Sequence, residues 1–253
     1  NSLLADGYHA LADSSSNIIG LIAVYYASRP ADETHPYGHH KFETLASLLI
    51  GITLVLISGG IIVKAGLWFW EPQTPQIGTI NLIILVITLI VNIIIAYFEF
   101  KQGKELKSEV LIADSLHTRS DILISGGVLL SLLLIKFGAP RILDPIISFL
   151  ISILIFISAL KIFKESIPIL VDKSVVSEET IIKIIKETVS EVVDVHKIRS
   201  RSRGDKTYID LHLLVSPEKT VREAHELNHQ LEKVIARELK RNIEFIAHIE
   251  PIE

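Results

Sequence analysis

Long apolar runs constrain this chain more than any other feature, because a helix needs roughly 20 mostly apolar residues to cross a bilayer. Five segments are long enough, and a Trp- and Phe-rich stretch after the second of them suits a membrane interface. The five cover about residues 3–28, 42–68, 79–99, 110–137 and 142–164. We therefore expect a bundle of transmembrane α-helices in a lipid bilayer.

The composition changes after about Lys164. Of the 253 residues, 49 % are hydrophobic, but that figure averages an aliphatic first part and a charged last part. Apolar residues recur there with helical or strand period, which predicts a small α+β domain with the order α-β-β-α-β. The expected elements are helix 176–191, strands 193–203 and 206–215, helix 219–238 and strand 242–250. We expect a membrane domain over 1–170 and a soluble domain over 171–253, which pairing or metal would help to stabilise.

Basic residues in the short loops predict the orientation, since cytoplasmic loops are enriched in Lys and Arg. Loops 29–41 and 101–107 and the start of the tail are basic, whereas 70–78 has no basic residue. The tail is therefore expected in the cytoplasm, in a multi-pass protein of the cell membrane. Five spans then place residue 1 outside, and the chain contains no Met, so we expect one further helix before it.

One motif, A-D-x-x-H-x-x-x-D, occurs twice inside the apolar segments. It places His9 and Asp13 on one helix, and His117 and Asp121 on another. Residues four apart share a helix face, so two such helices side by side would offer two imidazoles and two carboxylates, a set suited to tetrahedral Zn²⁺. A carboxylate at the bilayer centre costs about 2.5–3.5 kcal/mol, and a bound dication would offset this. The alternative is that these residues pair with one another or line a wet crevice, as proton relays do.

The same two helices carry one more acid each. Asp6 and Asp114 lie one turn from the motif histidines and could serve as carboxylates on the ion's path, or simply as hydrated helix ends.

The loop after the first segment is also rich in ligands for metals. "RPADETHPYGHHKFE" holds Asp32, His35, His39 and His40, with prolines and a glycine that favour a bent turn. The spacing allows either a metal site or a solvated polar loop.

The tail holds five of the ten histidines, and the absence of cysteine excludes thiolate sites. His212 lies in a strand of period two and His248 near the end of another, so neighbouring strands could bring them together. His229, four after His225, could occupy an exposed helix turn.

Taken together, these motifs resemble the cation diffusion facilitator family over essentially the whole chain, with the first of the family's six membrane helices missing. The resemblance implies a membrane site from the second and fifth helices, here His9, Asp13, His117 and Asp121, and the two-His, two-Asp set is similar to that of zinc-preferring members. It implies a loop site at Asp32, His35 and His39, and a charge lock between Lys41 and Asp172. In the cytoplasmic domain the matching metal positions are His196, His212, His225, His248 and Glu250.

The resemblance also implies a homodimer with metallochaperone-like cytoplasmic domains and proton-coupled efflux of divalent cations, not enzyme activity. We expect Zn²⁺ as substrate and regulatory ligand, ahead of Fe²⁺, Co²⁺, Cd²⁺ and Mn²⁺, and no nucleic-acid partner. A membrane-bound metal sensor without transport would share the same ligands. An intramembrane zinc hydrolase should keep an open coordination position, which four protein ligands would close.

Overall fold

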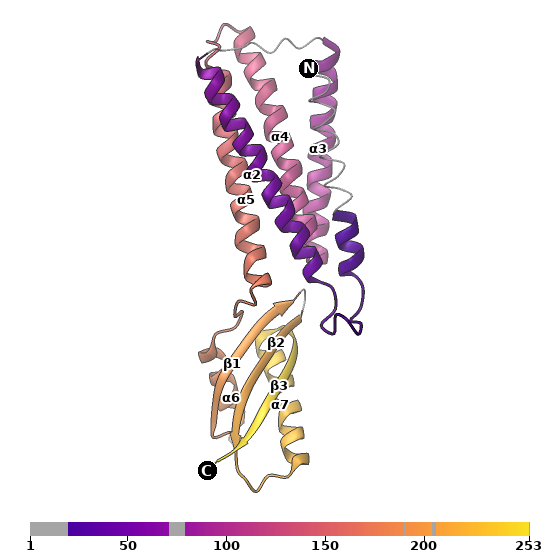
Figure 1. Cartoon of the computed structure of the whole chain (residues 1–253), viewed down its shortest axis with the longest axis vertical. Coiled ribbons are helices and arrows are strands. Elements are labelled where there is room, and N and C mark those ends of the chain that lie inside the picture. The colour runs from indigo at the N-terminus through magenta and orange to yellow at the C-terminus, as the bar shows by residue number, and fades with distance from the viewer. Residues whose placement is uncertain (1–19, 71–78, 190, 204–205, 253) are drawn as a thin grey trace. The chain divides into compact units, whose positions relative to one another are not determined.

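The computed structural model describes residues 20–70, 79–189, 191–203 and 206–252 (Figure 1). The chain divides into two compact units, Asn1–Ile167 and Pro168–Glu253. The first contains the membrane helices and the second the α+β tail, and each is described by itself.

Four long helices make up the described part of the membrane unit: α2 (Lys41–Trp70), α3 (Thr79–Leu106), α4 (Glu109–Lys136) and α5 (Leu143–Leu170) (Figure 1). Among the described residues, these four are long and apolar enough to cross a membrane. They correspond to the second to fifth predicted spans. The first, 3–28, lies mostly outside the described residues, where only 20–27 is seen as helix.

Two of these helices are longer than predicted. The charged stretch expected as loop 101–107 belongs to α3 as far as Leu106, and α5 continues to Leu170 rather than stopping at 164. Lysine is a good helix former whose long stem can lie along an apolar surface. The Lys104 ammonium, for example, lies 4.4 Å from the centre of the Phe100 ring one turn earlier. Charge therefore marks the membrane boundary here, but it does not end the helix.

Small residues allow close approach of the membrane helices. A Cβ built on Gly103 of α3 would lie 2.9 Å from Ile112 Cγ1 and 3.0 Å from the Ile112 backbone nitrogen on α4. Gly127 of α4 is packed in the same way against Ile151 of α5. Glycine at such contacts is typical of helix pairs in membranes, where close backbone packing replaces the hydrophobic effect.

A polar contact joins α2 to the start of α4. Ser108 caps α4, accepting from the Leu111 amide at 3.3 Å. The Ser108 hydroxyl in turn donates to Glu43 Oε1 on α2, which also accepts from the Val110 amide at 3.3 Å. A carboxylate beside the first turn of a helix is favoured by the helix dipole. Glu43 thus extends the cap of a helix whose capping residue, Ser108, lies 65 residues later in the chain.

The tail unit is a three-stranded sheet with two helices on one face. Its elements, in chain order, are α6 (Glu178–Thr188), β1 (Asp194–Arg203), β2 (Lys206–Val215), α7 (Val221–Leu239) and β3 (Asn242–Pro251). The strand order is β1-β2-β3, with β1 antiparallel and β3 parallel to β2. These elements match the predicted α-β-β-α-β order to within three residues at each end.

The core of this unit follows from period two in the strands and period 3.6 in the helices. From β2, Ile209, Leu211 and Leu213 point to the helices and are almost fully buried. The helices fill the same core with the apolar residues Ile181, Ile185, Leu227, Leu231 and Ile235. The alternate strand residues, including His212, consequently lie on the opposite face of the sheet.

Candidate metal centres

A row of histidines crosses the face of the sheet that the helices leave uncovered. His196, His212 and His248 are direct partners in the register of β1, β2 and β3. The His196 and His212 ring centres are 5.3 Å apart, and those of His212 and His248 4.7 Å. Strand pairing alone thus brings together residues that are distant in the sequence.

Glu250 completes this sheet-face group. Its Oε1 is 2.7 Å from His212 Nδ1, and its Oε2 is 3.2 Å from His196 Nε2. The hydrogen bond from His212, with smaller contributions from nearby positive charge, lowers the pKa of the Glu250 carboxyl. His196, His212 and Glu250 each place one ligand atom within 4.8 Å of the others. His248 lies at the rim, 67 % exposed, with Nε2 3.8 Å from Glu250 Oε1.

An irregularity in β1 aims His196 at this group. The register of β1 against β2 shifts between His196 and Arg199, and Lys197 between them has a φ of 51°. Such bulges re-aim side chains and recur beside functional sites.

Within one chain, His225 does not lie beside His196, His212 and Glu250, so its expected place in the cytoplasmic metal site stays a prediction. It lies on α7, whose buried residues Leu227, Leu231 and Ile235 face the other side of the sheet. Its ring is instead 4.6 Å from that of His229, one turn further along the helix. A linear motif gives the residue type but not which side of the sheet carries it.

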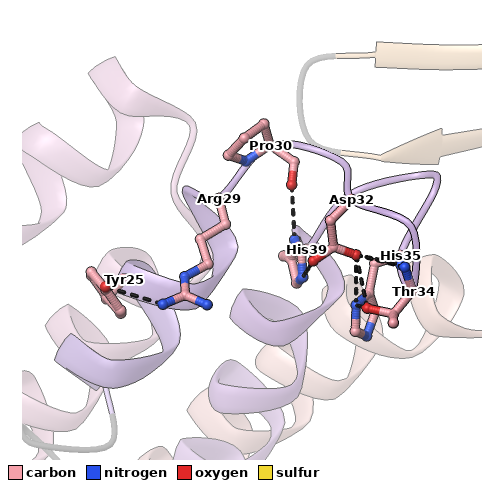
Figure 2. A network of polar contacts seen from close by, with 7 residues as sticks. All are labelled: Tyr25, Arg29, Pro30, Asp32, Thr34, His35 and His39. Carbon is pink, nitrogen blue, oxygen red and sulfur yellow. Dashed lines mark hydrogen bonds and ion pairs between the residues drawn. The ribbon is translucent and has the colours of Figure 1, made fainter.

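The loop after the first span forms a second group of ligands, shown in Figure 2. Asp32 Oδ2 lies 3.3 Å from His39 Nε2, and Asp32 Oδ1 lies 3.4 Å from His35 Nδ1. The two imidazole centres are 4.4 Å apart. Ligand atoms of all three residues lie within 4.8 Å of one another. His40, also in this loop, is exposed and is not part of the group.

The loop backbone holds Asp32 in place. Its Oδ1 accepts from the Thr34 hydroxyl at 2.8 Å and from the Thr34 and His35 amides at 2.9 and 2.6 Å (Figure 2). These bonds, the Thr34 hydroxyl first, lower the pKa of Asp32 to about 2. The following turn uses Gly38 at a φ of 77°, a conformation that glycine adopts without strain.

His39 is fixed differently, because its ring is buried at 5 % exposure. Its Nδ1 lies 3.2 Å from the Pro30 carbonyl oxygen, which leaves Nε2 directed at Asp32 (Figure 2). A second polar partner that fixes the ring is usual for histidines that bind metals.

In the membrane unit, the structure describes the α4 half of the predicted site. His117 is buried at 5 % exposure, and its Nε2 lies 4.0 Å from Asp121 Oδ2 one turn later. The shared face that the spacing predicted is therefore present on α4. His9 and Asp13, and with them Asp6, lie outside the described residues, so convergence of the two motifs stays a prediction.

Glu99 on α3 was missed by the sequence reasoning. Its Oε2 accepts from the Thr118 hydroxyl at 2.9 Å, next in sequence to His117. Thr118 also donates to the carbonyl of Asp114, one turn earlier on α4. An ionisable residue inside an apolar span marks a functional position by default. Glu99 lies three residues after Ala96 and four before Gly103, on the face of α3 that packs closely. A charged residue on the same helix face as these small residues was the sequence signal that could have indicated Glu99.

The predicted charge lock stays a prediction. Lys41 is the first residue of α2 in the membrane unit, and Asp172 follows α5 in the tail unit. Within the tail unit, Asp172 Oδ2 lies 3.7 Å from Arg201 Nη1, an ion pair that the sequence did not indicate.

Apolar spans that carry a buried histidine beside a partly buried aspartate, combined with imidazole–carboxylate groups outside the membrane, define a multi-pass membrane protein that handles divalent cations. Comparison with known protein families supports this class. The family description "Cation efflux transmembrane domain" matches residues 1–171, and "Cation efflux protein, cytoplasmic domain" matches residues 175–252. The chain belongs to the cation diffusion facilitator family of divalent metal efflux transporters, and it is therefore not an enzyme. Its C-terminal domain is cytoplasmic.

Individual relatives differ in the metal that their names give. An uncharacterized transporter of Methanocaldococcus jannaschii is 33 % identical over 89 % of this chain and 80 % of its own length. The zinc transporter ZitB of Pectobacterium atrosepticum is 33 % identical over 85 % of this chain and 68 % of its own length. The manganese efflux system protein MneP of Bacillus subtilis is 28 % identical over 99 % of this chain and 86 % of its own length.

Proposed function

We propose that this protein exports Zn²⁺ from the cytoplasm by exchange for protons, as a homodimer in the cell membrane with one membrane domain (1–170) and one cytoplasmic domain (171–253) per chain. The choice of Zn²⁺ is supported by one recurring observation. The loop group, the sheet-face group and the α4 pair each combine imidazole with carboxylate. Imidazole suits Zn²⁺, Co²⁺ and Fe²⁺, whereas Mn²⁺ prefers oxygen ligands. Transport of Mn²⁺, which the name of MneP raises, is the second candidate.

The transported ion would bind between His117 and Asp121 of α4 and His9 and Asp13 of the preceding motif. Such ligands bind metal only when deprotonated, so protons and metal compete for the same groups. In the inward-facing state, neutral imidazoles and ionised carboxylates would take up Zn²⁺. In the outward-facing state, arriving protons would displace it and neutralise the carboxylates for the return through the membrane.

The sheet-face and loop groups would bind Zn²⁺ as a regulatory ligand rather than as cargo. The sheet-face group lies open to solvent on one chain, with His248 at its rim. An ion held there could take further ligands from a second copy, which would couple metal binding to dimer closure. This gives the small tail unit the pairing that a domain of its size needs.

Flux through proteoliposomes tests this proposal. We expect vesicles with an internal zinc dye and an imposed pH gradient to take up Zn²⁺ with the wild type, and to lose this uptake with His117→Ala or Asp121→Ala. His40→Ala is the matched control, because His40 lies outside the loop group. Normal uptake by His117→Ala would contradict the assignment. Zinc binding by the wild type without any flux would identify a sensor instead.

A further inference from the structure

Two cations contact the same aromatic ring where α3 and α4 pack together. The Lys104 ammonium lies 4.4 Å from the centre of the Phe100 ring, and the guanidinium carbon of Arg119 lies 4.3 Å from it. Both distances are within the range of cation–π attraction. Lys104 belongs to α3 and Arg119 to α4, so one small anion beside Phe100 can contact charges from both helices.

The depth of this cluster places it near the cytoplasmic surface of the membrane. α5 leads into the cytoplasmic domain, and α4 is the span before it, so α4 begins on the cytoplasmic side. Gly103 meets Ile112 of the antiparallel helix α4. Arg119, seven residues after Ile112, is therefore level with Ala96, seven residues before Gly103. Because Phe100 is about one turn nearer the cytoplasm than Ala96, the Arg119 side chain extends toward the surface, as arginines in membrane spans do.

The surroundings of the cluster are apolar and exposed. Lys104 and Arg119 are exposed, and both belong to helices long and apolar enough to cross the membrane. Tyr97, on the same face of α3 as Phe100, is 63 % exposed, and its neighbour Phe98 is 57 % exposed. Large exposed side chains of this kind contact acyl chains when the helix is in a bilayer. A ligand that suits this surface has an anionic head and an apolar tail.

No carboxylate in the described part of the chain forms an ion pair with either cation. Glu105, next to Lys104 in the sequence, accepts instead from the Gln102 side chain at 3.4 Å. Glu99 accepts from the Thr118 hydroxyl at 2.9 Å. Charged side chains within membrane spans are costly and usually pair with an opposite charge. The described residues therefore leave the anionic partner to be supplied from outside the chain.

We propose that Lys104 and Arg119, held together by Phe100, bind the phosphate of an anionic phospholipid from the cytoplasmic leaflet. The forked donors of a guanidinium match two phosphate oxygens, and the ammonium adds a compact charge. Anionic lipids are enriched in this leaflet, and basic sites between membrane helices on this side bind lipid headgroups. Arg119 is exposed whereas His117, two residues earlier, is buried, so the lipid lies on the side of α4 away from that metal ligand. The bound lipid links α3 to α4.

Native mass spectrometry of the intact protein tests this site, because it counts bound lipids directly. The protein in detergent is mixed with equal amounts of phosphatidylglycerol and phosphatidylcholine, and we expect it to retain phosphatidylglycerol preferentially. Arg119→Gln and Lys104→Gln should each lower the retained phosphatidylglycerol severalfold. Lys136→Gln is the matched control, because it removes the same charge from an exposed position in the last turn of α4. It should leave lipid retention unchanged.

Three results would overturn the proposal. They are equal retention of the two lipids by the wild type, wild-type retention of phosphatidylglycerol by both Arg119→Gln and Lys104→Gln, and displacement of the lipid by millimolar inorganic phosphate. The last would assign the two cations to a free anion instead of a lipid. Both side chains are exposed, so both variants should melt close to the wild type in detergent. If Arg119→Gln failed to fold, Lys104→Gln, in the last turn of α3, would decide the test alone.

Discussion

Replacing Gly103 by alanine tests whether the spacing of α3 and α4 positions the membrane ligands. The added Cβ would lie 3.0 Å from the Ile112 backbone nitrogen, where ordinary contact begins at 3.4 Å, so the helices must separate by some 0.4 Å. The Ile112 backbone cannot rotate away as a side chain could. Metal sites tolerate deviations of about 0.2 Å in ligand distance, and His117 lies only five residues further along α4.

We therefore expect Gly103→Ala to lower zinc affinity more than protein stability. Overpacking costs about 1–3 kcal/mol, and alanine returns roughly 0.8–1 kcal/mol through its helix propensity, so most of the protein should stay folded in detergent. A misplacement of this order costs roughly tenfold or more in rate at a reacting centre. We expect a similar rise in the half-saturating zinc concentration for uptake by proteoliposomes.

Gly126 on α4 supplies the matched control, because a Cβ there meets nothing within 4 Å. Gly126→Ala should transport like the wild type and melt at the same or a slightly higher temperature. If Gly103→Ala and Gly126→Ala gave the same half-saturating concentration, the spacing of α3 and α4 would not set the site. If Gly103→Ala simply failed to fold, its melting curve would reveal this before any flux was measured.

Three further outcomes follow from other contacts. Glu99→Gln keeps an acceptor for the Thr118 hydroxyl but removes a charge. Zinc uptake should therefore fall while the melting temperature stays the same. Unchanged uptake would limit Glu99 to a role in packing. The hydrogen bond from His212 lowers the pKa of Glu250, so its carboxylate is ionised at neutral pH; Glu250→Gln should weaken Zn²⁺ binding to the sheet face in calorimetry at pH 7, and an unchanged affinity would contradict this. Leu231→Ala, in the tail core, should cost about 2–5 kcal/mol in urea unfolding, whereas Val221→Ala, at a position 89 % exposed, should cost almost nothing; equal losses would refute the assigned core.

The sequence predicted those features that repeat along the chain. Period two and period 3.6 sufficed for the tail, and the four-residue spacing of His117 and Asp121 correctly placed them on one helix face. The sequence also brought Asp32, His35 and His39 into one loop, because prolines and a glycine bend it. Local patterns determine local structure, and these sites are local.

Features that depend on long-range packing could not be read in this way. The charges of Lys101 and Lys104 predict a loop, whereas α3 continues to Leu106 because lysine side chains let a helix extend past the apolar core. The position of His225 relative to the strand histidines could not be predicted either, because a motif does not state on which face of a sheet a helix packs. The sequence near Glu99 did not reveal its contact with the α4 motif, because its hydrogen-bond partner Thr118 lies on another helix.

The bond between Glu43 and the cap of α4 has a consequence for how the bundle can change shape. Two hydrogen bonds fasten the first turn of α2 to the first turn of α4. Any movement of α4 that keeps those bonds must move α2 with it as one rigid body. The hinge must then lie elsewhere in the membrane unit, and a crosslink between the first turns of α2 and α4 should leave transport unchanged.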